Sequence, residues 1–459
     1  MRITFHGAAR TVTGSMHLLE VGGTTVLLDA GLYQGRRDEA RERNTSFPES
    51  AVRADACLLS HAHMDHSGSL PTLVKRGFAG RIHCTKTTVE LCDVLLRDSA
   101  GIQQRDFEFL VERGVPVTEP LYALEDVERT MGRFAPARYG TWIDVVPGVR
   151  ARFLDAGHIL GSAVTQIEAT EGSATRRVSF TGDLGRRGMP ILRDPEALPP
   201  SDVVITESTY GDREHPKLAD TEGELAAIVR ERARRDGRIL IPAFSVGRTQ
   251  NLIYSLYRIY KRGDCPRVPI FVDSPLSTRV TQIVARHPEC FDDEARAVLG
   301  PRGEPFAFPE LRYVETVEES KSLNDRRGPF IVIAASGMAE GGRILHHLRH
   351  GIGDPTTLVL IVGFQAEHTL GRRLVEHAPR VRIFGEELDV RAEVRTMNAM
   401  SAHADRSDLL HYLAPVARSC GKIFVVHGEP NAADALASGL RAEGCGDVRV
   451  PSPGDSFGI

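Results

Sequence analysis

The chain has 459 residues, of which 41% are hydrophobic and 26% are charged, and its formal net charge is −4. This length exceeds an ordinary single domain of about 100 to 200 residues and predicts two substantial cores. No run approaches the roughly 20 apolar residues that cross a bilayer, which excludes a protein built on membrane-spanning helices, and the small net charge does not indicate a nucleic-acid binder.

Arginine accounts for 51 of the 57 basic residues. Its planar fork suits phosphate, although a GC-rich genome produces the same bias. The seven cysteines are scattered without a Cys-x-x-Cys pair, so neither a disulfide framework nor a thiolate zinc site is predicted. Residues 1–6 enter a strand-like pattern without the features of a signal peptide, so we expect a cytoplasmic protein with no membrane partner.

Paired strands are predicted at the start of the chain. Residues 3–31 alternate apolar and polar side chains, and Gly22-Gly23 supplies a hairpin turn. Asp29 follows the apolar run that ends at Leu28. On the sequence pattern alone, Asp29 fits a simple turn as well as it fits a functional site.

The most informative stretch is the motif His-Ala-His-Met-Asp-His at residues 61–66, which follows a short apolar run typical of a buried strand. Alternate residues at a strand end can point the same way, so His61 and His63 can bind one cation while Asp65 and His66 turn toward a second. Imidazole and carboxylate are ligands that zinc takes. The alternative is a polar loop with a few hydrogen-bonded histidines.

Two further candidates follow later strands. After mainly helical spacing over residues 70–140, apolar strands resume at 149–154 and 177–181. His158 lies just past the first of these strands, and Asp183 lies just past the second. Either residue alone at such a place is usually structural.

A strand at residues 203–209 contains Glu207, and beyond it the pattern changes. Strand, loop and helix then recur at a regular interval, which predicts a doubly wound parallel sheet. We therefore expect an inserted α/β domain over residues 209–378. Its expected strands are residues 238–242, 268–272, 330–335 and 357–362, and its expected helices are residues 221–235, 249–260, 342–349 and 370–376.

The last part of the chain resembles the first in its pattern. Strands are expected at residues 381–384 and 392–397, ahead of His403, and a strand at 422–426 runs into His427. The expected organisation is a first domain in two parts, residues 1–208 and 379–459, interrupted by the insert.

The motif at residues 61–66, then His158, Asp183, Glu207, His403 and His427 in this order, resembles the β-CASP branch of the metallo-β-lactamase superfamily. That branch contains the endonuclease of pre-mRNA 3′-end cleavage, its bacterial and archaeal homologues, and RNase J. We expect neither an N-terminal KH pair nor the RNase J extension, which favours the short form that resembles the bacterial homologues. The resemblance implies an α/β fold in which an αββα sandwich carries an inserted β-CASP domain.

The resemblance also implies a set of metal ligands and a supporting residue. It places two zinc ions in the site, with manganese left open as the working metal, and it makes Asp29 a support of the histidine loop. The implied ligands are His61, His63 and His158 for one ion, Asp65, His66 and His427 for the other, and Asp183 as the bridge.

Asp65, Glu207 and His403 are the expected catalytic residues. Two cations can polarise a phosphate and stabilise an in-line displacement, but the leaving oxygen still needs a proton. His403, supported in its protonated form by Glu207, is the expected general acid, an arrangement worth roughly 10² to 10⁴ in rate.

Substrate phosphates are expected at glycine-containing loops of the insert, where free backbone N–H groups at helix starts can bind them. Any parallel α/β sheet has such turns, so each loop by itself fits a purely structural role equally well. The expected contacts are Ser245, Arg248, Ser336, Gly337, Met338, Arg343 and His368.

The leading hypothesis is a zinc-dependent ribonuclease in RNA processing or decay, and its expected partner is RNA. The alternatives are a DNA nuclease of the same branch, a thioester or lactam hydrolase, and a catalytically silent scaffold. A small-molecule hydrolase does not need a domain of about 170 residues over its metals, no ligand is eroded, and His427 favours RNA over DNA within the family. Endonucleolytic or 5′-exonucleolytic attack and a homodimer are left open.

Overall fold

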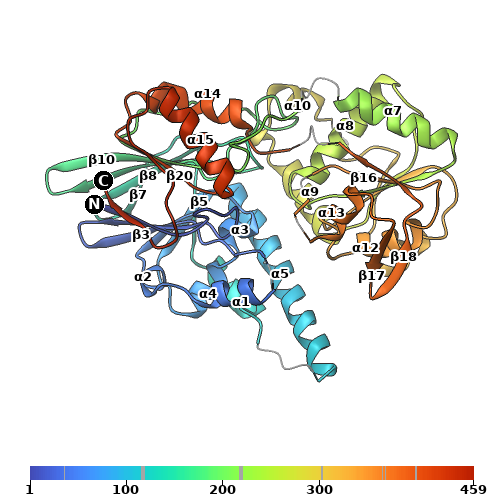
Figure 1. The fold of residues 1–459 in the computed structure, drawn as a ribbon, viewed down its shortest axis with the longest axis horizontal. Helices are drawn as coiled ribbons and strands as arrows, with labels where there is room; N and C mark the ends of the chain where they lie inside the picture. The colour runs from blue at the N-terminus through green and yellow to red at the C-terminus, as the bar shows by residue number, and fades with distance from the viewer. Residues whose placement is uncertain are drawn as a thin grey trace. The chain divides into compact units, whose positions relative to one another are not determined.

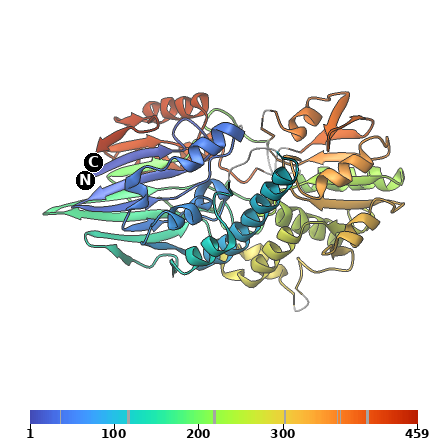
Figure 2. The same ribbon diagram turned by 90° about the horizontal axis from the view of Figure 1, so that it is seen from below.

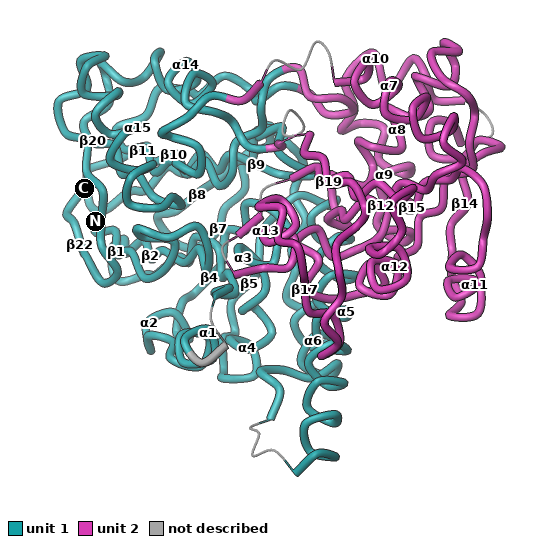
Figure 3. Tube along the Cα trace, turned by 45° about the vertical axis from the view of Figure 1, so that its right-hand side comes forward, with its two compact units in different colours: residues 1–187, 194–214, 403–459 teal, residues 188–193, 215–402 magenta. Residues whose placement is uncertain are grey.

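A computed structural model describes residues 1–35, 37–114, 119–216, 221–300, 303–363, 365–366, 368–397 and 401–459. The described chain forms two compact units (Figure 3). Unit 1 contains residues 1–187, 194–214 and 403–459, and unit 2 contains residues 188–193 and 215–402. No helix within these ranges is both long enough and apolar enough to cross a membrane.

Unit 1 contains two seven-stranded mixed sheets. The strands of the first sheet, in spatial order, are β22 (Ser456–Gly458), β1 (Arg2–Gly7), β2 (Met16–Val21), β3 (Thr24–Leu28), β4 (Ala56–Leu58), β5 (Arg81–Thr85) and β6 (Phe134–Ala137). The strands of the second sheet are β21 (Val448–Arg449), β20 (Lys422–Val425), β11 (Val203–Thr206), β10 (Ala174–Phe180), β9 (Ala163–Glu171), β8 (Val149–Asp155) and β7 (Ile143–Val146).

The main core of unit 1 lies between these sheets. Phe5 and Leu19 of the first sheet pack in one cluster with Phe153, Phe180 and Phe424 of the second. Strands with one buried face alternate between buried and exposed side chains, and β1 has this pattern. Burial of both inner faces therefore holds the two sheets together.

Helices cover the outer faces of the two sheets (Figure 1). On the second sheet, α14 and α15 bury Leu409, Leu413 and Leu436 against Val204 and Ile423. On the first sheet, the long helix α5 contacts β5 and β6 (Figure 2). The helices of unit 1 are α1 (Arg37–Thr45), α2 (Glu49–Val52), α3 (Met64–Ser67), α4 (Leu70–Lys75), α5 (Lys86–Glu112), α6 (Leu124–Met131), α14 (Arg406–Ala417) and α15 (Pro430–Ala442). The predicted αββα sandwich is confirmed.

Unit 2 is built on a six-stranded sheet whose pairings are all parallel. Its order is β14 (Leu311–Tyr313), β13 (Ile270–Val272), β15 (Phe330–Ala334), β12 (Arg238–Pro242), β16 (Leu358–Ile361) and β19 (Glu393–Thr396). The central strands are almost wholly apolar because helices cover both faces. The predicted doubly wound sheet is confirmed.

The helices of unit 2 follow the strands, as a parallel sheet requires. On one face of the sheet, Ile344 and Leu348 of α12 pack with Leu240 and Val332. The helices are α7 (Thr221–Arg234), α8 (Arg248–Arg262), α9 (Pro275–Arg286), α10 (Asp293–Val298), α11 (Val317–Ser322), α12 (Ile344–Gly351) and α13 (Leu370–Val375). A two-stranded hairpin, β17 (Arg380–Ile383) and β18 (Glu386–Asp389), follows them.

Two strands differ from their expected place, because β17 and β19, which were expected in the first domain, both lie in unit 2. The sequence pattern assigns residues 392–397 to the closing part of the first domain, whereas β19 pairs in parallel with β16 in the sheet of unit 2. β19 is an edge strand, and Glu393 and Arg395 alternate with Val394 along it. Alternation identifies a strand at an edge but does not identify the sheet that the strand joins.

Candidate metal centre

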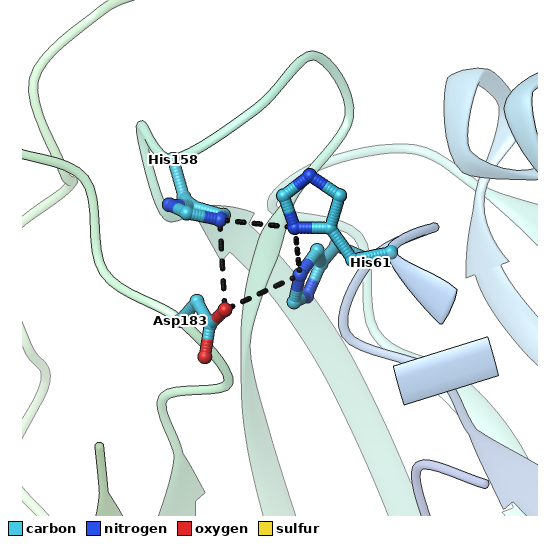
Figure 4. Close-up of side chains that lie close together, drawn as sticks. His61, His158 and Asp183 are labelled. Atoms are coloured by element: carbon cyan, nitrogen blue, oxygen red, sulfur yellow. Dashed lines mark hydrogen bonds and ion pairs between the residues drawn. The ribbon is translucent and has the colours of Figure 1, made fainter. Parts of the chain in front are cut away.

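Four side chains on three loops of unit 1 form the first part of the site. His61 and His63 follow β4, His158 follows β8, and Asp183 follows β10. Nδ1 of His63 lies 3.1 Å from Nε2 of His61 and 3.3 Å from Nε2 of His158. Oδ2 of Asp183 lies 3.5 Å from each of these Nε2 atoms (Figure 4). Three imidazole nitrogens and one carboxylate oxygen thus converge at one point, as a zinc site requires.

Asp65, His66 and His427 form the second part of the site. His427 follows β20, so this group joins the first sheet to the second. Nε2 of His427 lies 3.1 Å from Nε2 of His66 and 3.6 Å from Oδ2 of Asp65. The other nitrogen, Nδ1, lies 3.3 Å from the hydroxyl of Thr209. Thr209 is a neighbour of the site that the sequence analysis did not identify.

Asp183 faces both groups with different oxygens. While Oδ2 belongs to the first group, Oδ1 lies 3.3 Å from Nε2 of His66 and 3.5 Å from Nδ1 of His427. Oδ1 is buried and has no hydrogen-bond partner among the described residues. A buried carboxylate oxygen without a partner costs free energy, and a bound cation would remove that cost. The residues therefore fit divalent metal ions, which would lower the pKa of a water molecule and polarise a phosphoryl oxygen.

Three of the histidines are neutral at pH 7. Burial lowers the pKa of His61 and of His158 well below the usual value, and it lowers the pKa of His63 to about 4. His66 differs, since Asp183 and Asp29 outweigh its burial and raise its pKa well above the usual value. Neutral imidazole is the form that binds metal. The first group is thus ready to bind a cation, whereas His66 must release a proton to do so.

Asp29 and Ser60 fix the orientation of two imidazoles from behind. Oδ2 of Asp29 lies 2.6 Å from Nδ1 of His66, and Oδ1 accepts a hydrogen bond of 2.7 Å from the backbone N–H of Ser60. The Ser60 hydroxyl lies 3.0 Å from Nδ1 of His61. With Nδ1 held in both rings, Nε2 is left facing the site. Sequence reasoning identified Asp29 but not Ser60.

The position of Ser60 also explains why residue 182 is a glycine. Gly182 precedes Asp183, has a φ of +53°, and a Cβ at this position would lie 2.5 Å from Cβ of Ser60. A side chain at position 182 would therefore push apart the two loops that carry Asp183 and Ser60.

His403 and Glu207 lie beside Asp183. Nδ1 of His403 lies 3.4 Å from Oε1 of Glu207 and 3.9 Å from Oδ2 of Asp183. Glu207 is buried and accepts hydrogen bonds from the backbone N–H groups of Leu184 and Thr209, at 2.6 and 3.2 Å. Burial alone would lower the pKa of His403, but Glu207 and then Asp183 outweigh it and raise the pKa to about 9. His403 is therefore protonated at neutral pH, and its side chain is 24% exposed.

The expected phosphate contacts all lie in unit 2, at loops that follow β12, β15 and β16. The hydroxyl of Ser336 accepts hydrogen bonds from the N–H groups of Glu340 and Gly341, at 3.1 and 3.3 Å. Arg343 donates to Oδ1 of Asp273, at 2.6 Å, and to two backbone carbonyls. Ser336 thus shapes its own loop, and Arg343 ties that loop to the residues that follow β13 and β14. A contact with phosphate stays a prediction for Ser245, Arg248, Ser336, Gly337, Met338, Arg343 and His368.

Ten of the expected residues are therefore brought together in unit 1. Seven of them are the expected ligands, and the other three are Asp29, Glu207 and His403. The αββα sandwich and the clustered histidines and aspartates at one edge of its sheets define a metallo-hydrolase. The chain belongs to the metallo-β-lactamase superfamily, in its β-CASP branch.

Three family models match the chain in succession. The metallo-beta-lactamase superfamily matches residues 9–237, the Beta-Casp domain matches residues 249–374, and the Zn-dependent metallo-hydrolase RNA specificity domain matches residues 387–451. The chain is therefore a zinc-dependent metallo-hydrolase of the RNA-specific branch, as its sequence motifs indicated.

Similar proteins span most of the chain. It is 39% identical over 444 residues to ribonuclease TTHA0252 of Thermus thermophilus, covering 97% of each protein. It is 30% identical to the transcription termination factor FttA of Methanocaldococcus jannaschii, covering 94% of this chain and 67% of that protein. A solved structure of a protein of unknown function from Enterococcus faecalis has the same fold, with a TM-score of 0.59, 14% identity and 99% coverage of both chains.

Proposed function

We propose that this protein is a ribonuclease that hydrolyses RNA phosphodiester bonds with two zinc ions. The observation that carries the proposal is the position of Asp183, whose two oxygens face two separate groups of nitrogen and oxygen ligands. A bridging carboxylate between two ligand groups is the arrangement of a two-metal site for phosphoryl chemistry. The RNA specificity model over residues 387–451 and the full-length similarity to a ribonuclease support RNA as the substrate.

The chain's own residues would divide the work as follows. One ion would be held by His61, His63 and His158, the other by Asp65, His66 and His427, and Asp183 would contact both. Asp29 and Ser60 would hold the ligand rings in place, and Asp65 would also orient the attacking water.

His403 would supply the proton that the leaving ribose oxygen needs. Its Nδ1 faces Glu207, which favours the protonated ring and leaves Nε2 as the atom that carries the transferred proton. Glu207 and Asp183 beside it are almost fully buried, whereas the His403 side chain is partly exposed and can reach a substrate. Glu207 would act through His403, as a positioning residue.

The test compares substrates in parallel. The zinc-loaded protein should cleave labelled single-stranded RNA and should hydrolyse bis(p-nitrophenyl)phosphate slowly, and it should leave DNA of the same sequence and a thioester largely intact. Equal or faster cleavage of DNA would contradict the RNA assignment, and thioester hydrolysis without nuclease activity would overturn the proposal. A circular RNA in the same series distinguishes endonucleolytic from 5′-exonucleolytic attack, because only an endonuclease opens the circle.

A further inference from the structure

Phe244 exposes its side chain at the end of a buried strand of unit 2. Its side chain is 41% exposed, whereas every other residue from 239 to 256 is buried or half-buried. Its backbone is fixed, because its carbonyl oxygen accepts hydrogen bonds from the N–H and the hydroxyl of Thr249, at 3.3 and 2.8 Å. Exposure of one apolar residue is ordinary, so a function for the Phe244 side chain has to be argued from its surroundings.

Two glycines on neighbouring loops face the ring. A Cβ at Gly337 would lie 2.7 to 2.9 Å from three carbons of the Phe244 ring, and a Cβ at Gly363 would lie 3.9 Å from one of them. Neither Gly337 nor Gly363 is among the positive-φ residues of the described chain. At position 337 it is therefore the close approach of the ring, and not backbone conformation, that accounts for glycine. One side of the Phe244 ring therefore packs against the backbone at Gly337, and the ring remains partly exposed to solvent.

The ring lies where three loops meet. Phe244 follows β12, Gly337 follows β15, and Gly363 follows β16, and these strands are neighbours in the order β15-β12-β16. All three strands are parallel, so their carboxyl ends share one edge of the sheet. Ligands of doubly wound sheets bind at this edge.

We propose that Phe244 is a stacking platform for one unpaired base of the RNA, an inference that rests on the ribonuclease function proposed above. Single-stranded RNA exposes its bases, and the flat face of a base stacks on an aromatic ring whatever the base is. Phe244 thereby adds base contacts to loops that were expected to bind phosphate only.

The size of the exposed feature argues for a base and against a protein partner. A stable protein interface covers roughly 800 Å² on each side. Along residues 239–256, by contrast, the exposed apolar surface is a single ring. One ring matches one base, which is the unit of aromatic recognition in single-stranded RNA.

The experiment measures kcat/KM of the zinc-loaded, full-length protein on a single-stranded RNA and on copies with one abasic nucleotide, moved one position at a time along it. In the wild type, one abasic position should lower kcat/KM by about 5- to 100-fold, the loss expected for one base–aromatic stack. Phe244→Leu should lower kcat/KM on the intact RNA by a similar factor. The abasic copy should then show no further loss, because the same contact cannot be removed twice.

Two further variants separate stacking from a general disturbance. Phe244→Tyr keeps the flat ring and should keep the sensitivity to that abasic position. Phe384→Ala removes another exposed ring of unit 2, 57% exposed on the turn between β17 and β18, and should behave as the wild type.

The outcomes are distinct. If the wild type cleaves RNA and Phe244→Leu retains the full abasic loss at every position, the stacking inference is overturned and the ribonuclease function stands. If the wild type cleaves no RNA, both proposals fail.

Discussion

Asp29 holds His66 by its back nitrogen, with 2.6 Å between Oδ2 of the carboxylate and Nδ1 of the ring. The two residues are 37 positions apart in the chain, and both are buried. Asp29 has a φ of +59°, a conformation that aspartate adopts more readily than most residues, and it uses both of its oxygens, since Oδ1 binds the N–H of Ser60. The position of His66 in the site therefore depends on this carboxylate.

Asp29→Asn should weaken zinc binding by about 10- to 100-fold, the usual loss when the partner of a metal-bound histidine is changed. The amide keeps the shape of the carboxylate but can accept hydrogen bonds on one side only. Zinc affinity can be measured by competition with a fluorescent chelator. Ser15→Ala is the milder control, because the Ser15 hydroxyl donates to the same carboxylate at 3.2 Å without contacting a ligand. Unchanged affinity in Asp29→Asn would contradict the supporting role.

Asp183→Ala should lose metal and activity together. The wild type should carry about two zinc ions per chain, and removal of the shared carboxylate should leave fewer than one tightly bound, because each group then has only three neutral or singly charged ligands. Elemental analysis of the purified proteins measures this directly. Asp212→Ala, which removes an aspartate that pairs with Arg213 and belongs to neither ligand group, should keep the full complement. A full complement in Asp183→Ala would remove the basis for a bridging role.

The positions of the candidate ligands could be predicted because each one follows a short apolar run. Local apolar patterns predict strands β4, β8, β10 and β20, and each candidate ligand lies within a few positions of the end of its strand. In a layered sandwich those ends share one edge, so local motifs become neighbours in space. His61 and His427 are separated by most of the chain, and they still belong to the same site.

Some features of the site and fold could not be predicted, because they depend on contacts that leave no local pattern in the sequence. Ser60 is an ordinary small polar residue, and its role follows only from its distance to Asp29 and His61. β9 was not predicted, although a two-residue turn at Gly172-Ser173 joins its end at Glu171 to the start of β10 at Ala174. The sheet that β19 joins is likewise set by packing in three dimensions and not by its own residues.

Arg343→Lys should lower kcat/KM on RNA by roughly 10- to 100-fold, the size of one or two lost hydrogen bonds to a charged group. The guanidinium donates to Asp273 and to the carbonyls of Val314 and Glu315, and an ammonium cannot reach all three. The loop that begins at Ser336 would then lose its shape. Hydrolysis of bis(p-nitrophenyl)phosphate should change far less, because a small substrate makes no use of remote contacts.

The control for this substitution is Arg349→Lys, since Arg349 lies on α12 and pairs with the exposed Glu386 at 2.9 Å. It should leave both activities unchanged. Losses of equal size on RNA and on the small phosphodiester in Arg343→Lys would show that the substitution disturbs the protein as a whole.

His403→Ala separates proton donation from metal binding. Its Nδ1 faces Glu207, so the structure favours an acid over a ligand, and the variant should keep its zinc. Cleavage of RNA should slow by about 10² to 10⁴-fold, because the ribose oxygen is strongly basic and leaves poorly without a proton. A nitrophenolate is stable without a proton, so hydrolysis of bis(p-nitrophenyl)phosphate should remain close to the wild-type rate.

The same assignment fixes the sign of the pH dependence. Burial lowers the pKa of His403, but Glu207 and Asp183 outweigh it and raise the pKa to about 9 in the metal-free site, and zinc ions bound at Asp183 would lower it from there. The ring loses its proton as the pH rises through its pKa. A general acid works only when protonated, so the rate of RNA cleavage should fall on the alkaline side, and the rate on the nitrophenyl ester should not follow it. Glu207→Gln removes the charge that favours the protonated ring and should move this fall to lower pH.

Zinc content and the rates on both substrates must all be measured for His403→Ala, because a distorted site would also lose activity. A distorted site would slow the two substrates by the same factor and would release zinc, whereas a missing acid slows only the substrate with the basic leaving group. If His403→Ala keeps its zinc and slows RNA and bis(p-nitrophenyl)phosphate equally, His403 is not the proton donor. In that case the pairing of His403 with Glu207 serves to position the loop beside Asp183, and the leaving oxygen takes its proton from water.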